Sequence, residues 1–265
     1  VVFWKEPTDA QLGQVFEIIK ESGGSEPGII NGAEARRRAP WFSGVNPCAE
    51  ILLGNKAFCN LTEVDVGKFR DDNGGLDRAL YVTARANYRQ TLVNLDDGIL
   101  QRTWHENNEY LRLCGVGLTG ITTREDLNEY DYKRFRNIAV HGAYSMADEL
   151  GTQRPKNVTT IKPSGTLSKI MDTTEGCHKP MGKYIFNNVN FSINDPMLPK
   201  LREAGYHVVV NPTDEHNAIV TFPVSWENIR FDKEGDLYVN NETAIEQLSR
   251  YKLLMDSYVE QNCSI

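Results

Sequence analysis

Cysteine is scarce in this sequence, and the cysteines that occur have none of the spacings typical of structural thiols. The chain has 265 residues and an odd number of cysteines: Cys48, Cys59, Cys114, Cys177 and Cys263. No CxxC pair occurs, so the sequence predicts neither a disulfide framework nor a zinc knuckle. The histidines are scattered without an HExxH pattern, and we predict no metal site. This cysteine usage is typical of a reducing compartment, so we expect a cytoplasmic protein.

Long hydrophobic runs and a surplus of basic residues are also absent. No apolar run approaches the roughly 20 residues of a membrane-spanning helix, and we expect no membrane partner. Residues 1–7 have neither the basic region nor the apolar core of a signal peptide. The formal net charge of −7 argues against a nucleic-acid surface. A small phosphate-bearing ligand is still allowed, because backbone amides can hold phosphate without positive side chains.

Helical and strand patterns alternate along the chain. Helices are predicted from Thr8 to Gly23 and over 76–88, 104–113, 124–150 and 242–260. Strands are predicted over 61–66, 158–161, 184–192, 207–210 and 218–222, whereas 223–241 has the composition of a loop. This alternation predicts an α/β protein with mostly parallel strands. The length is ample for a well-buried core.

Two segments resemble phosphate sites only weakly. Arg36-Arg37-Arg38 lies in a loop-like stretch, 22–45, with one predicted helical turn; the run is either a solvated loop or a phosphate contact. The segment 115–120 is rich in glycine but lacks the third glycine of a dinucleotide fingerprint. We therefore expect it to be a tightly packed turn that enters a buried strand, with Cys114 in the core.

The most informative stretch is Asn46-Pro47-Cys48-Ala49-Glu50, which is followed by Cys59. Residues two apart point the same way along an extended backbone, so Asn46, Cys48 and Glu50 could share one face. Such a face would present a hydrogen-bonding amide, a nucleophilic or one-electron sulfur, and a general base. The alternative is a buried structural cysteine in an ordinary strand, because free cysteine is among the most buried residue types.

A second candidate site follows the strand predicted at 158–161. The loop there contains small residues and hydroxyls, Pro163, Ser164, Gly165 and Thr166. When residues of this kind directly follow a strand, several of their backbone N–H groups can donate hydrogen bonds to one phosphate. A plain turn is the alternative, since no Gly-Lys-Ser/Thr of a Walker A loop is present.

Three blocks together resemble the catalytic subunit of ribonucleotide reductase. They are Asn46 to Glu50 with Cys59-Asn60-Leu61, then 111–120, and then 160–166. Their order and approximate spacing are similar to those in the family, and the resemblance extends from about residue 25 to the end of the sequence. The sequences of residues 59–64 and 162–166 look most like the corresponding sequences of the adenosylcobalamin-dependent class II enzymes, in particular the monomeric ribonucleoside-triphosphate reductases.

The resemblance implies a ten-stranded α/β barrel, built from two five-stranded halves with a finger loop through its centre. By this resemblance, residues 1–265 are a single partial domain, with the finger loop at about 44–60 and the second barrel half at about 61–265. We expect the first barrel half upstream and a C-terminal tail downstream of this stretch.

The resemblance also implies roles for the candidate residues. Cys48 would hold a thiyl radical that takes the 3′ hydrogen of the ribose. Glu50 would be the general base on the 3′ hydroxyl, helped by Asn46. Cys59 would be one of two thiols that reduce the ribose, and Pro163 to Thr166 would hold the substrate phosphates. Adenosylcobalamin would generate the radical, because no side chain does so unaided.

The implied partners are a ribonucleoside triphosphate, a thioredoxin-like reductant and the other barrel half, which another chain could supply. The partner thiol of Cys59 is expected upstream of residue 1, so residues 1–265 alone are expected to be inactive. Two departures from the family pattern stand out: Gly176-Cys177-His178-Lys179-Pro180, where Gly-Ile-His-Pro is usual, and Asn187-Asn188, where arginines are common. The alternatives are a class I type reductase chain that does not use cobalamin, and a non-catalytic nucleotide-binding relic of the same fold.

Overall fold

Three parallel strands organise the larger of the two units into which the chain divides. In the computed structural model, which describes residues 1–265, this unit comprises Val1–His178 and Ala244–Ile265. The smaller unit is Lys179–Thr243. The sequence predicts one partial domain, and the structure refines this into two units because 179–243 forms sheets and an apolar cluster of its own. The boundaries of the finger loop and the barrel half stay predictions.

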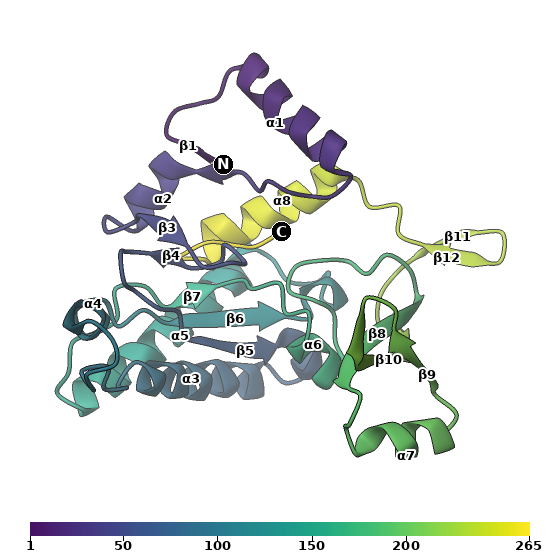
Figure 1. The fold of residues 1–265 in the computed structure, drawn as a ribbon. Coiled ribbons are helices and arrows are strands. Elements are labelled where there is room, and N and C mark those ends of the chain that lie inside the picture. Colours follow the sequence, from purple (N-terminus) through teal and green to yellow (C-terminus); the bar gives the residue numbers. More distant parts are fainter. The chain divides into compact units, whose positions relative to one another are not determined.

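The parallel sheet has the order β5 (Leu61–Asp65), β6 (Gly115–Thr119) and β7 (Thr159–Thr160), and Figure 1 shows the three strands side by side. Its register aligns Glu63 with Gly117, and Gly117 with Thr160. Every residue of β6 is buried. Because side chains alternate along a strand, Val116 and Leu118 point into the main core, whereas Gly115 and Gly117 leave room on the opposite face. The segment predicted to be a tightly packed turn before a buried strand is thus the buried strand itself, and only Gly120 has the left-handed conformation of a turn.

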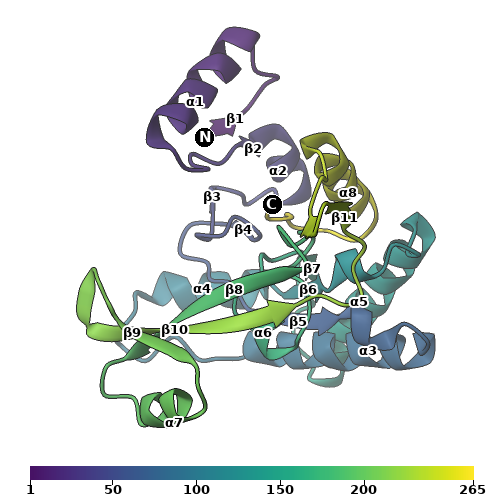
Figure 2. The ribbon, with the colours of Figure 1, turned by 90° about the vertical axis from the view of Figure 1, so that its right-hand side faces the viewer.

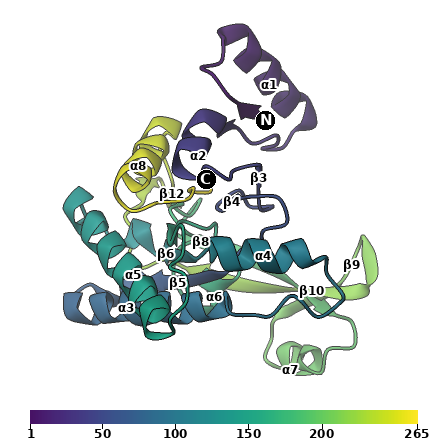
Figure 3. The same cartoon turned by 90° about the vertical axis from the view of Figure 1, so that its left-hand side faces the viewer.

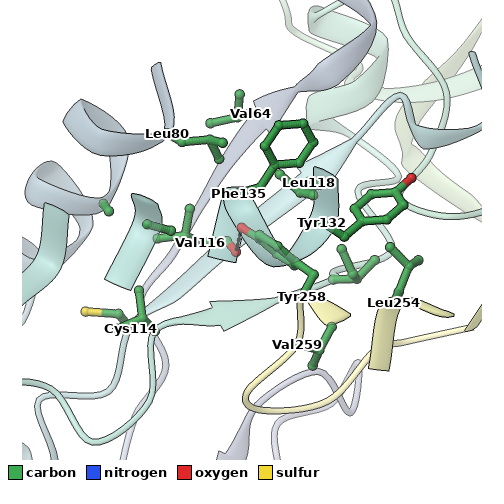
Figure 4. Close-up of a cluster of buried hydrophobic side chains, with 14 of the residues drawn as sticks. Val64, Leu80, Cys114, Val116, Leu118, Tyr132, Phe135, Leu254, Tyr258 and Val259 are labelled. Atoms are coloured by element: carbon green, nitrogen blue, oxygen red, sulfur yellow. Dashed lines mark hydrogen bonds between the residues drawn. The ribbon is translucent and has the colours of Figure 1, made fainter. Parts of the chain in front are cut away.

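Helices α3 (Asn73–Gln90), α5 (Glu129–Glu149) and α8 (Ala244–Ser257) supply the rest of this core. Figures 1 and 3 show α3 and α5 together beside the sheet, and α3 buries the predicted four-residue series Leu76, Leu80, Ala84 and Tyr88. Asn128 begins α5 with a capping box, which satisfies two backbone donors at the helix start. Figure 4 shows how Phe135 and Tyr258 pack against Val116 and Leu118. The predicted helices are confirmed to within a few residues of their ends.

Shorter elements complete the larger unit. Thr8 caps α1 through a capping box, and Gly23 ends it in the left-handed conformation, as predicted. The remaining elements are β1 (Val2–Phe3), α1 (Asp9–Ser22), β2 (Ile30–Asn31), α2 (Gly32–Arg38), β3 (Gly44–Val45), β4 (Leu52–Leu53), η1 (Val66–Phe69), α4 (Arg102–Leu111), η2 (Ile121–Thr123) and α6 (Leu167–Ile170).

The basic run at 36–38 belongs to α2, which confirms the helical turn predicted there, and its three side chains make contacts within the chain. Arg36 stacks on the Trp4 ring, with its guanidinium carbon 4.3 Å from the ring centroid. Arg37 and Arg38 both pair with Glu34. Arg38 also donates to the carbonyl oxygens of Met255 and Val259 at the end of α8, where the helix dipole favours a cation. The run therefore ties the N-terminal part of this unit to its last helix.

The smaller unit is antiparallel, so the prediction of mostly parallel strands is correct only for the larger unit. Its main sheet has the order β8 (Tyr184–Ser192), β10 (Asp214–Ser225) and β9 (His207–Asn211), which Figure 2 shows beside α7 (Met197–Glu203). The loop predicted at 223–241 is wrong. There β10 continues to Ser225, and β11 (Asp232–Glu234) pairs with β12 (Leu237–Val239) around a left-handed Gly235.

The α/β class is confirmed, but residues 1–265 form no closed barrel. Their sheets contain two or three strands each. The second barrel half and the finger loop therefore stay predictions. No helix combines the length and the apolar character needed to cross a membrane.

We predict that Tyr258→Phe lowers the free energy of unfolding by about 1 kcal/mol, because it removes one buried hydrogen bond and little volume. The Tyr258 hydroxyl donates to the Val116 carbonyl oxygen at 2.9 Å, the contact drawn dashed in Figure 4. Urea unfolding followed by circular dichroism measures the change. Tyr130→Phe is the matched control, because Tyr130 is 75% exposed and its replacement should have no effect. Equal effects of the two substitutions would contradict the prediction.

Candidate active site

The segment around Cys48 is a tight turn and not the extended strand that the sequence predicts. The Ala49 N–H donates to the Asn46 carbonyl oxygen at 2.8 Å, and Ala49 has a left-handed φ of 63°. Asn at the first and Pro at the second position favour such a turn. As a result, Asn46, Cys48 and Glu50 do not share one face: Cys48 is exposed, whereas Asn46 and Glu50 are buried.

Residues from distant parts of the chain hold this turn in place. The Asn262 side chain donates to the Ala49 carbonyl oxygen at 2.7 Å. The Glu50 carbonyl oxygen accepts from the Thr160 hydroxyl at 2.7 Å and from the Asn262 backbone N–H at 3.2 Å. Within the turn, the Asn46 Oδ1 accepts from the Ile51 N–H at 2.9 Å. The backbone beside Cys48 is therefore fixed by β7 and by the segment after α8.

Glu50 and Cys59 occupy a partly desolvated environment. The Glu50 side chain is almost completely buried, and its Oε2 has no hydrogen-bond partner. Cys59 packs on an apolar cluster that contains Ile51 and Leu111. Burial raises the pKa of the Cys59 thiol, and the nearby charges of Glu50 and Cys48 raise it further, while Lys162 opposes them. The carboxyl and the two thiols thus lie within electrostatic reach of one another.

A second buried carboxyl, Glu63, lies in the same group. Its Oε2 accepts from the Ser164 hydroxyl at 2.7 Å and lies 3.3 Å from the Lys162 ammonium. The other oxygen, Oε1, is buried without a partner. Burial raises the pKa of Glu63, Ser164 and Lys162 lower it, and the charge of Glu50 raises it again. Glu63 therefore feels both the positive charge of Lys162 and the negative charge of Glu50.

The parallel register explains how Glu63 and Lys162 meet. Glu63 is on β5 and Lys162 follows β7, so the ion pair reaches across β6 at Gly117. A Cβ atom at Gly117 would lie 3.3 Å from the Glu63 Cγ and 3.4 Å from the Lys162 Cγ. At Gly115, a Cβ atom would lie 3.0 Å from the Ile51 Cδ1. The two glycines leave the space that the ion pair and the segment after Glu50 occupy.

The predicted phosphate loop is only partly open. Gly165 and Thr166 are exposed, and nothing lies within 4 Å of a Cβ atom built at Gly165. Ser164 is buried in a left-handed conformation, and its hydroxyl is already bound to Glu63. Pro163 is half-buried. The loop thus offers exposed backbone at two positions, while Ser164 serves the carboxyl beneath it.

Sequence reasoning did not single out Glu63, Lys162, Thr160 and Asn262 as site residues. Glu63 had a detectable signal, because it is a charged residue inside a segment that reads as a buried strand. Asn262 had none, since its role depends on a contact 213 residues away in the chain. No group of three or more histidine, cysteine or carboxylate side chains is arranged to hold a metal ion.

Known proteins share this sequence pattern. The chain is 28% identical over 240 residues to the adenosylcobalamin-dependent ribonucleoside-triphosphate reductase of Lacticaseibacillus paracasei, with 75% of this chain and 32% of that protein covered. The enzymes of the same name from Lactobacillus helveticus and Lactobacillus leichmannii are 29% and 27% identical, covering 80% and 86% of this chain and 33% and 36% of those proteins. The chain thus spans about a third of the length of these relatives. No protein-family model matches it.

Solved structures share the fold. A crystal structure of a B12-dependent, class II ribonucleotide reductase superposes with a TM-score of 0.78, at 22% identity, covering 95% of this chain and 40% of that one. The resemblance to class II reductases is confirmed. The class Id ribonucleotide reductase alpha subunit of Actinobacillus ureae shares the fold more distantly, with a TM-score of 0.51 at 15% identity, covering 74% of this chain and 43% of that one.

For this reductase-like chain, we predict that iodoacetamide alkylates Cys48 first, at least about tenfold faster than Cys59, because alkylation needs an accessible thiolate. Cys48 is exposed, whereas Cys59 is half-buried and its pKa is raised. Peptide mapping by mass spectrometry over time measures the rates. Cys48→Ser should remove the fast phase and leave the slow phases unchanged. Alkylation of Cys59 as fast as Cys48 would be the contrary result.

We also predict that Glu63→Gln becomes more stable relative to the wild type as the pH rises above 4.5, the ordinary pKa of this group. Because the folded pKa is raised, the folded state holds the proton more tightly, and the wild type loses stability until the pH passes the folded pKa. The slope is at most about 1.4 kcal/mol per pH unit for one proton. Glutamine does not titrate, so the free energy of unfolding of the variant does not decrease for this reason as the pH rises.

Urea midpoints of both proteins between pH 5 and pH 8 measure the difference. Asp126→Asn is the control, because Arg124 lowers the pKa of Asp126. The stability that Asp126 contributes is complete above its ordinary pKa of 3.8, so its difference from the wild type should stay constant over this range. A Glu63→Gln difference that stays as constant as the Asp126→Asn difference over this range would refute the prediction.

Proposed function

We propose that this chain carries part of the active site of an adenosylcobalamin-dependent ribonucleoside-triphosphate reductase. The reaction would convert ribonucleotides to 2′-deoxyribonucleotides by thiyl-radical chemistry. The observation that carries the proposal is the grouping of the exposed Cys48 thiol with the buried Glu50 carboxyl and the half-buried Cys59 thiol. Binding alone requires neither thiol, whereas this reduction requires both together with a base.

Cys48 would take the 3′ hydrogen of the ribose, and its exposure allows substrate to reach the sulfur. Glu50 would accept the 3′ hydroxyl proton, since its Oε2 is buried and has no partner within the chain. Asn46 would assist as a donor through its amide nitrogen, because its Oδ1 is engaged by the Ile51 N–H. The role of Glu50 requires the substrate hydroxyl to lie beside Oε2, which has no partner within the chain.

Cys59 would supply one of the two thiols that the overall reaction consumes. A ribonucleotide and two thiols give a deoxyribonucleotide, a disulfide and water, and a thioredoxin-like dithiol would reduce the disulfide again. The second thiol would come from a segment of the protein outside residues 1–265, or from another chain that carries the other barrel half. We therefore expect residues 1–265 alone to be inactive.

The substrate phosphates would bind at Pro163 to Thr166. The exposed backbone of Gly165 and Thr166 suits this contact. The bond between Glu63 and the Ser164 hydroxyl keeps a buried carboxyl directly below the loop, and Lys162 offsets its charge. Lys162 would therefore keep the site from repelling a polyphosphate.

Adenosylcobalamin would supply, when bound, the one-electron chemistry that a thiol lacks. Such chemistry requires an accessible thiol in a fixed position, and Cys48 meets this requirement. Its sulfur is exposed, and it lies on a turn whose backbone is hydrogen-bonded to Thr160 and Asn262. The anchored turn would hold the sulfur in one place for the cofactor and then for the ribose. We further propose a cytoplasmic location, a finger loop at about 44–60, and a barrel half that begins at about residue 61.

The test uses the protein at its full natural length, with adenosylcobalamin, dithiothreitol and a ribonucleoside triphosphate. We predict deoxynucleotide formation, loss of turnover in Cys48→Ser, and a decrease of about 10²- to 10⁴-fold in Glu50→Gln, because a positioned general base contributes that much. Glu106→Gln is the matched control, since Glu106 is exposed and pairs with Arg102 on α4.

Other outcomes separate the alternatives. Turnover that does not need cobalamin would replace the proposal with a class I type chain. Nucleotide binding without turnover, unchanged in Cys48→Ser, would indicate a non-catalytic relic. Turnover by residues 1–265 alone would contradict the need for a thiol from elsewhere.

A further inference from the structure

Two buried cysteines outside the candidate active site lie in contact with each other. The Cys177 and Cys263 sulfurs are 3.8 Å apart, and the residues are 1% and 3% exposed. They are 86 positions apart in the sequence, and both belong to the larger unit. A disulfide has an S–S length of about 2.05 Å, so the sulfurs need to approach by less than 2 Å. Side-chain rotation can supply a movement of this size.

The pair differs from the other buried thiol of the chain. Cys114 has apolar surroundings, its thiol donates to the Arg112 carbonyl oxygen at 3.6 Å, and burial strongly raises its pKa. Between Cys177 and Cys263, one thiol can donate to the other. That bond lowers the pKa of Cys177 and raises the pKa of Cys263, so Cys177 is the better nucleophile.

We propose that Cys177 and Cys263 are a site of oxidative modification, at which hydrogen peroxide, an oxidant small enough to enter a buried site, converts the two thiols to an intramolecular disulfide. The Cys177 thiolate attacks one peroxide oxygen, the O–O bond breaks, and Cys177 becomes a sulfenic acid while hydroxide leaves. The Cys263 thiol then attacks the Cys177 sulfur and displaces water. The protein loses two protons and two electrons, and the peroxide is reduced to two molecules of water.

This disulfide would connect the backbone on both sides of Lys162. Cys263 forms a parallel bridge with Ile161, the residue before Lys162. Gly176, the residue before Cys177, is so close to the Lys162 carbonyl oxygen that a Cβ atom there would lie 2.4 Å from it. The modification would therefore fix the segment that presents the 163–166 loop. The inference does not depend on the proposed function, because it rests on the distance between the two sulfurs and on the burial of both residues.

The experiment incubates the full-length protein with hydrogen peroxide, alkylates the remaining thiols after denaturation, and maps the peptides by mass spectrometry. We expect a cross-linked peptide pair containing Cys177 and Cys263, at least tenfold more abundant than in protein oxidised while unfolded. The double variant Cys48→Ser, Cys59→Ser should keep the cross-link, which separates this site from the candidate active site. Cys114→Ala should keep it as well.

Two further readouts test the order of the steps. In Cys263→Ser the resolving thiol is missing, so Cys177 should stay a sulfenic acid that dimedone labels after denaturation. The oxidised wild type should melt at a temperature higher by roughly 10 °C, because the bond closes a long loop. Complete alkylation of both cysteines after prolonged oxidation of the folded wild type would overturn the proposal, and this measurement needs no variant. A cross-link found only between Cys48 and Cys59 would overturn it equally.

Discussion

An ion pair that crosses a strand is the constraint on which the rest of the site depends. Glu63 and Lys162 belong to strands or strand ends on opposite sides of β6, and they meet over Gly117, where a side chain would crowd both of them. The pair is largely withdrawn from water, so removing one partner would leave a buried charge, at a cost of about 3–5 kcal/mol. Gly117 is thus explained by the ion pair above it, Gly115 by the Leu61 and Ile51 side chains, and Val116 and Leu118 by the core on the other face.

The turn that presents Cys48 depends on contacts across the whole length of the larger unit. Its backbone groups are satisfied by Thr160 and by Asn262, which stands after the last helix. Buried backbone groups need such partners, because an unpaired one costs as much as a lost hydrogen bond. The position of the exposed sulfur is therefore a property of the assembled sheet and not of the local turn alone.

Electrostatics gives the site its chemical character. Two buried carboxyls, Glu50 and Glu63, have one unpartnered oxygen each, and Glu63 lies between the negative charge of Glu50 and the positive charge of Lys162. Unsatisfied buried polar atoms are rare in folded proteins and call for an explanation. A polyhydroxylated, phosphate-bearing ligand would provide the missing donors and contact the exposed backbone at 165–166.

The sequence by itself determined the helices, the α/β class and the residues that carry the reductase resemblance. These follow from short-range periodicity, caps and local motifs, which one stretch of chain contains entirely. Tertiary structure alone decided that Asn46 to Ala49 is a turn, that the smaller unit is antiparallel, and that Glu63 and Lys162 complete the site. It also brought Cys177 to Cys263. The physical reason is that each of these depends on partners distant in the sequence, whose approach is set by sheet register and packing.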